Sequence, residues 1–143
     1  MKISEVIKSK GADVTTVGPK SSIRSAVGIM KAMKIGALLV RHDSAIVGIL
    51  SERDVVRALA DHGARTLDMA VDELMTRNLT TCKAEDKLTD VMRIMTQRRI
   101  RHLPVMEGNQ LKGIVSIGDA VKNRLDELEM ETNVLRDAYT AVT

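Results

Sequence analysis

Two patterns of apolar residues alternate along the chain, one with helical spacing and one typical of short strands. Apolar residues share one helical face over residues 23–33, and the same spacing returns over residues 88–95. Two β-rich runs separated by a polar turn follow each of these stretches. The runs cover residues 37–40, 46–50, 103–106 and 111–115. After Ser51 and after Ser116 the helical spacing resumes. The pattern therefore predicts a helix, a hairpin and a second helix, written twice.

A shift of 65 positions superimposes one copy on the other. About 12 of about 45 positions are identical between residues 15–59 and 80–124, and no gap is needed. The shift aligns Thr15-Thr16 with Thr80-Thr81, Ile29-Met30 with Ile94-Met95, Ile35 with Ile100, Val40 with Val105, Gly48 with Gly113, Ser51 with Ser116 and Asp54 with Asp119. Because a unit of about 65 residues buries too little apolar surface to be comfortable alone, we expect the two copies to pair.

The repeat suggests where the chain divides. We predict a first repeat at residues 1–62, a linker at 63–70, a second repeat at 71–126 and a helical tail at 127–143. Gly63 favours the end of a helix, and polar residues surround it. Within the tail, three apolar residues recur at intervals of seven, namely Leu128, Leu135 and Val142. A contact with a second subunit and packing back onto the chain's own core are both open interpretations of that spacing.

Composition narrows the function classes. The 143 residues include no Phe or Trp and one Tyr, so aliphatic side chains and nine Met must fill the core and wall any pocket. Binding of single-stranded nucleic acid by aromatic stacking is excluded. The net charge of +3 is too small to indicate nucleic acid by itself. With no apolar run long enough to span a bilayer and no signal-peptide pattern, we expect a soluble, cytoplasmic protein.

The strongest local motif joins a strand end to a helix start. It reads Gly-x-x-Ser-x-x-Asp at Gly48 to Asp54 and again at Gly113 to Asp119. Glycine lets another group approach the backbone, the serine hydroxyl and helix amides can hold phosphate, and the carboxylate can accept hydrogen bonds from a ribose diol. This combination suits a nucleotide.

The same motif has a purely structural interpretation. Ser-x-x-Asp ahead of an apolar run resembles a helix capping box, in which serine is the N-cap and the acidic residue is at N3. The box prefers Glu or Gln to Asp, and a cap does not require the preceding glycine or its recurrence at one offset. Cap and ligand group can also be the same atoms.

The order of elements and the two Gly-x-x-Ser-x-x-Asp turns resemble a tandem cystathionine β-synthase (CBS) domain pair, also called a Bateman module. The segments Val47 to Asp54 and Arg101 to Val105 are similar to sequences typical of that family, and the resemblance extends over roughly residues 3–125. It implies a mixed α/β (α+β) fold of two β-α-β-β-α repeats that pack through their sheets with pseudo-twofold symmetry, followed here by the helical tail.

The resemblance also implies two clefts that take AMP, ADP, ATP, NAD(H) or S-adenosyl compounds, each cleft drawing on both copies. One cleft would combine Ser116 and Asp119 with Thr15, Ile35, Gly36 and Ala37 of the first copy. The other would combine Ser51, Arg53 and Asp54 with Thr80, Ile100, Arg101, His102 and Leu103 of the second. The aspartates and serines would hold ribose and phosphate, and residues of the opposite copy would contact adenine.

The cations make the two clefts unequal. Arg53 offers a forked guanidinium to phosphate, whereas Gly118 occupies the matching position of the second copy. Arg101 and His102 are candidates to compensate, because in the family side chains at that strand start often reach phosphate in the cleft of their own Asp. The basic run Arg98 to His102 has three open interpretations: a ligand phosphate, a solvated helix end or, as a minor option, nucleic acid.

Catalysis has little support in the sequence. Neither a P-loop nor a dinucleotide fingerprint occurs, and neither Ser51 nor Ser116 has a histidine in its own turn to act as a base. We predict no metal site, because the three His residues are scattered without cysteine or carboxylate at ligand spacing. Cys82 aligns with Val17 of the other copy, which indicates a small core residue and not a reactive thiol.

We therefore expect a non-enzymatic sensor that binds an adenine nucleotide, with AMP, ATP or NAD(H) as candidate ligands and no catalytic cofactor. It would act as a homodimer and change a partner protein by conformational change, with neither membrane nor nucleic acid as partner. Two alternatives stay open. One is a ligand-free interaction module in which both turns are only helix caps, and the other is a nucleotide-processing enzyme.

Overall fold

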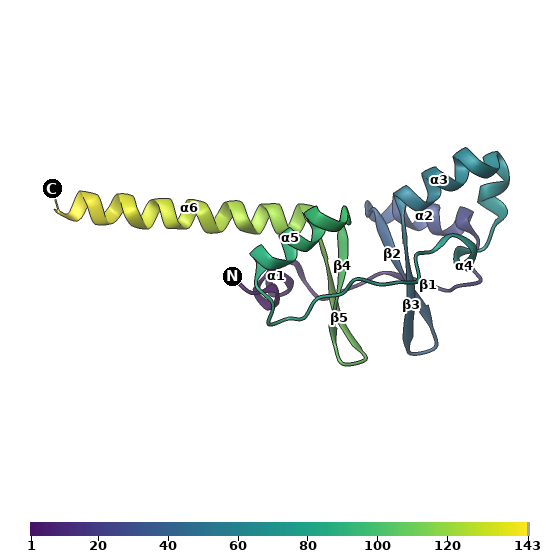
Figure 1. The fold of residues 1–143 in the computed structure, drawn as a ribbon, viewed down its shortest axis with the longest axis horizontal. Coiled ribbons are helices and arrows are strands. Elements are labelled where there is room, and N and C mark those ends of the chain that lie inside the picture. Colours follow the sequence, from purple (N-terminus) through teal and green to yellow (C-terminus); the bar gives the residue numbers. More distant parts are fainter. Residues whose placement is uncertain (143) are drawn as a thin grey trace. The chain divides into compact units, whose positions relative to one another are not determined.

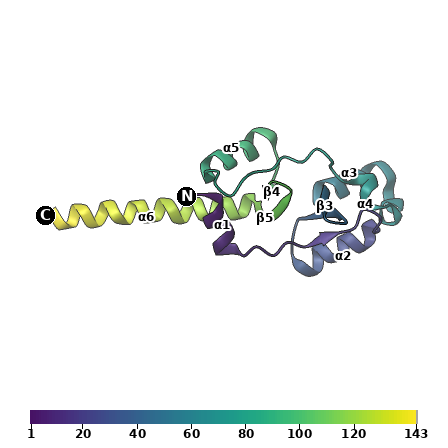
Figure 2. The ribbon, with the colours of Figure 1, turned by 90° about the horizontal axis from the view of Figure 1, so that it is seen from below.

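The computed structural model describes residues 1–142, which form two compact units (Figures 1 and 2). One unit contains residues 13–80, and the other contains residues 1–12 together with the chain from residue 81 onward. Each holds a small sheet with helices packed on it, so the predicted mixed helix and strand fold is confirmed. Among the described residues, no helix combines the length and the apolar character needed to span a bilayer.

The unit of residues 13–80 contains a three-stranded sheet in the order β1-β2-β3. Strand β1 runs parallel to β2, and β2 runs antiparallel to β3. The elements are β1 (Thr16–Val17), α2 (Ile23–Met33), β2 (Ala37–His42), β3 (Ala45–Ser51), α3 (Glu52–His62), the 3-10 helix η1 (Gly63–Asp68) and α4 (Val71–Leu74). The buried face of α2, formed by Ile23, Ala26 and Met30, packs in the core of this unit, as its helical spacing predicts.

The other unit repeats this arrangement. Its elements are α1 (Ile3–Lys10), α5 (Leu88–Arg98), β4 (His102–Glu107), β5 (Gln110–Ser116) and α6 (Ile117–Val142). Its two hairpin strands pair antiparallel, and Val105 faces Gly113 as Val40 faces Gly48 in the first hairpin. In place of a third strand, Cys82 makes an isolated parallel bridge to Val105. The two hairpins thus share one register, including an irregularity directly after Val40 and after Val105.

The compact units do not follow the order of the repeats along the chain. Helix α1 begins the first repeat, but its Ile3 and Val6 are fully buried in the core that contains the second hairpin. Conversely, Val71 and Met75 begin the second repeat and lie in the core of the first hairpin. Each hairpin is therefore covered by a segment that belongs, by sequence, to the other copy.

The two exchanged segments are themselves a repeat. Ile3-Ser4-Glu5-Val6-Ile7 aligns with Val71-Asp72-Glu73-Leu74-Met75 at a shift of 68 positions. In both segments the glutamate side chain accepts a hydrogen bond from a backbone N–H three residues earlier, Glu5 from Lys2 at 3.2 Å and Glu73 from Ala70 at 2.9 Å. A shift fixed at 65 cannot detect this match, because the spacing between segment and hairpin differs by three residues.

A glycine in β3 and a glycine in β5 let the exchanged segments pack closely against these strands. A Cβ placed on Gly48 would lie 2.6 Å from Sδ of Met75 and 3.0 Å from the backbone oxygen of Thr76. A Cβ on Gly113 would lie 2.8 Å from Cδ1 of Ile7. We expected these glycines to let a ligand approach the backbone, but in each unit the group that approaches is the exchanged segment of the chain itself.

Residues 63–70, which connect the repeats in sequence, pack against the first repeat. Most of them form η1, where Thr66 is buried and its hydroxyl donates a 3.0 Å hydrogen bond to the backbone oxygen of Ala58.

The predicted helical tail is confirmed as helical, and it continues α6 without a break from the helix start at Ile117. Every residue of 128–141 is exposed, so this part of α6 does not pack back onto the core. The side chain of Val142 and all of Thr143 lie outside the described residues.

We predict that Gly48→Ala destabilises the protein by about 1–3 kcal/mol, because the added methyl meets a backbone oxygen that a rotamer change cannot move. Gly28→Ala is the matched control. Gly28 lies in α2 with nothing within 4 Å of the position that a methyl group would take, so alanine there stabilises by about 0.5–1 kcal/mol. Urea unfolding followed by circular dichroism measures both. Equal midpoints for Gly48→Ala and the wild type would contradict the close approach.

We predict that Cys82 does not react with a thiol reagent in the folded protein. Its side chain is 3% exposed, and burial raises the pKa of the thiol to about 12, so almost no thiolate forms near pH 8. The Thr81→Cys variant, with its new thiol at an exposed neighbouring position, gives the reference rate. The reagent 5,5′-dithiobis(2-nitrobenzoic acid) should label Thr81→Cys once within minutes and label Cys82 only in urea. Comparable rates at both thiols would refute the prediction.

Candidate nucleotide-binding turns

The first Gly-x-x-Ser-x-x-Asp turn joins β3 to α3 and forms a complete capping box. Oδ2 of Asp54 accepts hydrogen bonds from the backbone N–H of Ser51 at 2.8 Å and from its hydroxyl at 3.0 Å. The backbone N–H of Asp54 lies 3.4 Å from the same serine oxygen. The structural interpretation of the motif is therefore correct for this turn, because the side chains that would meet a ligand also satisfy the helix start.

A residue outside the motif completes this turn. The hydroxyl of Thr76 donates a 3.3 Å hydrogen bond to Oδ1 of Asp54. Thr76 follows directly after Met75 in the exchanged segment, and its backbone pairs with Ile49 of β3 in both directions. One carboxylate oxygen of Asp54 thus faces its own turn, and the other faces the segment that covers the strand.

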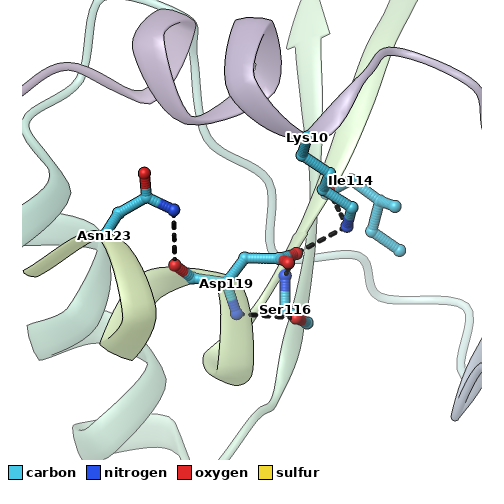
Figure 3. A network of polar contacts seen from close by, with 5 residues as sticks. All are labelled: Lys10, Ile114, Ser116, Asp119 and Asn123. Carbon is cyan, nitrogen blue, oxygen red and sulfur yellow. Dashed lines mark hydrogen bonds and ion pairs between the residues drawn. The ribbon is translucent and has the colours of Figure 1, made fainter. Parts of the chain in front are cut away.

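The second turn, between β5 and α6, repeats the box with a different partner (Figure 3). Oδ2 of Asp119 accepts from the backbone N–H of Ser116 at 3.0 Å, and the N–H of Asp119 donates to Oγ of Ser116 at 3.1 Å. Nζ of Lys10 donates to Oδ2 of Asp119 at 2.5 Å and to the backbone oxygen of Ile114 at 2.9 Å. Lys10 is the last residue of α1, so the helix that contains the exchanged segment supplies a cation to this turn.

The electrostatics of Asp119 follow from these contacts. Partial burial alone would raise its pKa, but the Lys10 ammonium and the hydrogen bonds from Ser116 outweigh burial and hold the pKa below its ordinary value. Asp119 is therefore a carboxylate at neutral pH. Among the described residues of its own unit, 1–12 and 81–142, Oδ1 of Asp119 accepts no hydrogen bond.

The strand starts lie beside the helix starts within each unit. The first amide of α3, that of Glu52, donates to the backbone oxygen of Gly36 at 3.0 Å. In the other unit the amide of Ile117 donates to the backbone oxygen of Arg101 at 2.8 Å. The first amide of each of these helices is therefore already bonded and is not available for phosphate. A phosphate at either turn would have to contact the serine hydroxyl, a cationic side chain such as Arg53 or Lys10, or a later amide of the helix.

The structure thus brings each strand start together with the aspartate of its own copy. Ala37 pairs with Ser51 across the first hairpin, and His102 pairs with Ser116 across the second. The side chain of Leu103 is fully buried in a core, and that of Ala37 is 6% exposed. Partly buried positions are Thr15, Ile35, Gly36, Thr80, Ile100 and His102, whereas Arg53 and Arg101 are exposed. The predicted clefts combine residues of different units, and that combination stays a prediction.

Lys10 and Thr76 are the residues that the sequence analysis missed. Both follow the exchanged segments, which lie outside the alignment of residues 15–59 with 80–124. The shared Glu5 and Glu73 motif, aligned at a shift of 68, is the signal that leads to them.

Among the described residues, no three His, Cys or carboxylate side chains gather as metal ligands.

We predict that Lys10→Met raises the pKa of Asp119, because burial is then opposed only by Ser116. A carboxylate with a lowered folded-state pKa stabilises the protein above its unfolded-state pKa, and this stabilisation is lost as the pH falls through the folded-state pKa. The variant should therefore lose about 0.5–1 kcal/mol near neutral pH and show a weaker loss in acid. Urea unfolding between about pH 2 and pH 7 measures this.

The matched control for that experiment is Lys8→Met, which removes an exposed cation from the same helix. The control should follow the wild-type pH profile. Identical profiles for the wild type, Lys8→Met and Lys10→Met would show that the Lys10–Asp119 pair contributes nothing to stability.

Comparison with known proteins supports the geometry just described. The chain is 32% identical over 123 residues to the CBS domain-containing protein YhcV of Bacillus subtilis, an alignment that covers 86% of this chain and 87% of that protein. The crystal structure of the CBS-domain containing protein ATU1752 from Agrobacterium tumefaciens matches with a TM-score of 0.85 and 44% identity, over 87% of this chain and 99% of the other.

A more distant structure shares the fold. The CBS domain pair of protein MJ0100, solved with 5′-methylthioadenosine and S-adenosyl-L-methionine, matches with a TM-score of 0.79 at 22% identity, covering 89% of this chain and 98% of that chain. The family model for the CBS domain matches twice, at residues 3–61 and 71–126, and both matches begin at the exchanged segments. The two matches together cover most of the chain and include both hairpins, so the chain belongs to the CBS domain family.

Proposed function

We propose that this protein is a regulatory module that binds an adenosine-containing ligand at its two aspartate turns and signals through a change of conformation. The observation that carries the proposal is the orientation of Asp119. One of its oxygens is fixed by Ser116 and Lys10, and the other accepts no hydrogen bond among the described residues of the same unit, 1–12 and 81–142. A ribose hydroxyl is a donor of the right kind for such an oxygen.

The surroundings of this carboxylate suit a nucleotide. Lys10 can move from Asp119 to a ligand phosphate, since an ammonium carries three donors on a flexible stem. Arg53 gives the first turn a cation of its own, so both turns offer a carboxylate and a positive charge. Because the chain holds no Phe or Trp, the adenine would contact aliphatic side chains and strand-start backbone.

The family context is consistent with this proposal. Tandem CBS domains are regulatory modules, and the related pair of MJ0100 was solved with two adenosine compounds. We propose AMP, ATP, NAD(H) or an S-adenosyl compound as the ligand of this chain, a homodimer as its assembly, the cytoplasm as its location and a separate protein as the regulated partner. The protein itself would carry out no chemistry on the ligand.

The complete capping boxes favour one alternative. If both turns act only as helix caps, the protein is a ligand-free interaction module, and the aspartates stabilise the fold without meeting a nucleotide. A test must therefore change the ligand-binding oxygens while leaving the caps intact.

We predict that AMP, ATP, NAD(H) or S-adenosylmethionine raises the melting temperature, because a ligand that binds only the folded state stabilises it by mass action. Asp54→Asn together with Asp119→Asn should abolish at least about 90% of that shift. Asparagine keeps an oxygen for the serine N–H, so the caps and the fold persist. Circular dichroism melts with and without about 1 mM of each compound measure the shifts.

The matched control is Asp86→Asn. Oδ2 of Asp86 accepts a 2.8 Å hydrogen bond from the backbone N–H of Lys83, the same local geometry away from both turns. This variant should keep the full ligand response. Absence of any shift across the panel would favour the ligand-free module, and conversion of the added nucleotide, seen by chromatography, would favour an enzyme.

A further inference from the structure

Helix α6 extends beyond the elements that pack on it (Figures 1 and 2). Its first turns belong to the core, where Ala120 is fully buried, and α1 and α5 contact it. From residue 128 to residue 141 every residue is exposed. Large apolar side chains of α6 are exposed both just before this stretch and within it, for example Leu125 at 60% and Leu135 at 72% exposure.

Part of this apolar surface forms one continuous stripe. Its residues alternate at spacings of four and three, which is the a/d pattern of a heptad repeat. The stripe contains Val121, Leu125, Leu128, Thr132, Leu135 and Tyr139. Position d holds Val121, Leu128 and Leu135, and position a holds the others. Two further exposed apolar residues, Met130 and Val134, lie at positions f and c, off the stripe.

Charges flank the stripe in a complementary order. The g positions hold Arg124 and Glu131, and the e positions that follow each of them by five residues hold Glu129 and Arg136. In a parallel two-stranded coiled coil a g residue faces the next e residue of the other helix. Arg124 then faces Glu129 of a second copy, and Glu131 faces Arg136 of that copy, so every such pair is attractive.

The antiparallel registers in which Leu135 faces another residue of the stripe fit these charges less well. In the register that aligns residue 125 with residue 135, Glu129 faces its own counterpart and so does Glu131, and both contacts are repulsive. In the register that aligns residue 125 with residue 142, only Glu129 and Arg136 pair favourably, and Glu131 faces Ala138. Arg124 already contacts Glu127 on its own helix, and its guanidinium has further donors to span both partners.

We propose that α6 is a homodimerisation element that pairs with α6 of a second copy as a short parallel coiled coil, with Leu128 and Leu135 as its central layers. The stripe covers residues 121–139, about 28 Å of helix. With Thr132 and Tyr139 at position a, the dimer forms weakly and in a concentration-dependent way. This assembly is independent of any ligand at the aspartate turns.

The test is sedimentation equilibrium of the full chain from roughly 1 µM to 1 mM. Leu128→Glu together with Leu135→Glu should raise the dissociation constant of the dimer at least about 100-fold, because two buried leucine layers are replaced by facing carboxylates. The matched control, Met130→Glu with Val134→Glu, adds the same charges off the stripe and should leave the constant within about threefold of the wild type.

Two further variants examine pairing and direction. Glu131→Arg should weaken the dimer about tenfold, and adding Arg136→Glu should restore it. Leu135→Cys should form a disulfide between copies on mild oxidation, since equivalent d positions face each other only in the parallel arrangement. The buried Cys82 does not interfere.

A mass that does not change when Leu128 and Leu135 become glutamate would overturn the proposal, including the case in which copies assemble through other surfaces. A wild type that is monomeric up to 1 mM would do the same. A dimer in which Leu135→Cys fails to cross-link would overturn the parallel arrangement.

Discussion

The close approach of an exchanged segment to a strand glycine is the contact on which each compact unit depends. Met75 lies against Gly48 and Ile7 against Gly113, at distances that leave no room for a methyl group. Because each hairpin offers only a small apolar face, it needs this cover to complete a core. The cover comes from the other copy's sequence in both cases, so neither repeat contains its whole core. The tandem arrangement is thereby built into the packing of each half.

The same exchange sets the chemistry at the two turns. Thr76 reaches Asp54 because Met75 is held against β3, and Lys10 reaches Asp119 because α1 is held against β5. One turn thus receives a neutral hydroxyl and the other an ammonium. The inequality that the sequence suggested between Arg53 and Gly118 is therefore offset from outside the motif. The segments that close the cores also determine which polar group lies beside each aspartate.

The sequence predicted the parts of this fold that local patterns encode. Helical spacing and β-rich runs located both hairpins and their flanking helices, and the shift of 65 aligned one copy with the other. The exchange could not be predicted from those patterns, because apolar residues such as Ile3 and Val71 show only that a helix face is buried, not which core buries it. The Ser-x-x-Asp spacing predicted both capping boxes, whereas the bond of each helix's first amide depends on the backbone oxygen of Gly36 or Arg101, which no side-chain pattern reports.

The position of α1 has a consequence for how the chain acquires its structure during synthesis. The unit of residues 13–80 is contiguous, so it can fold as soon as that stretch has emerged. Helix α1 must wait until β5 has been made, about 100 residues later, with Ile3 and Val6 exposed meanwhile. Contacts between residues so far apart in sequence slow folding and lengthen the exposure of apolar surface. Helix α1 is thus made first but reaches its native position only after the unit of residues 13–80 can fold.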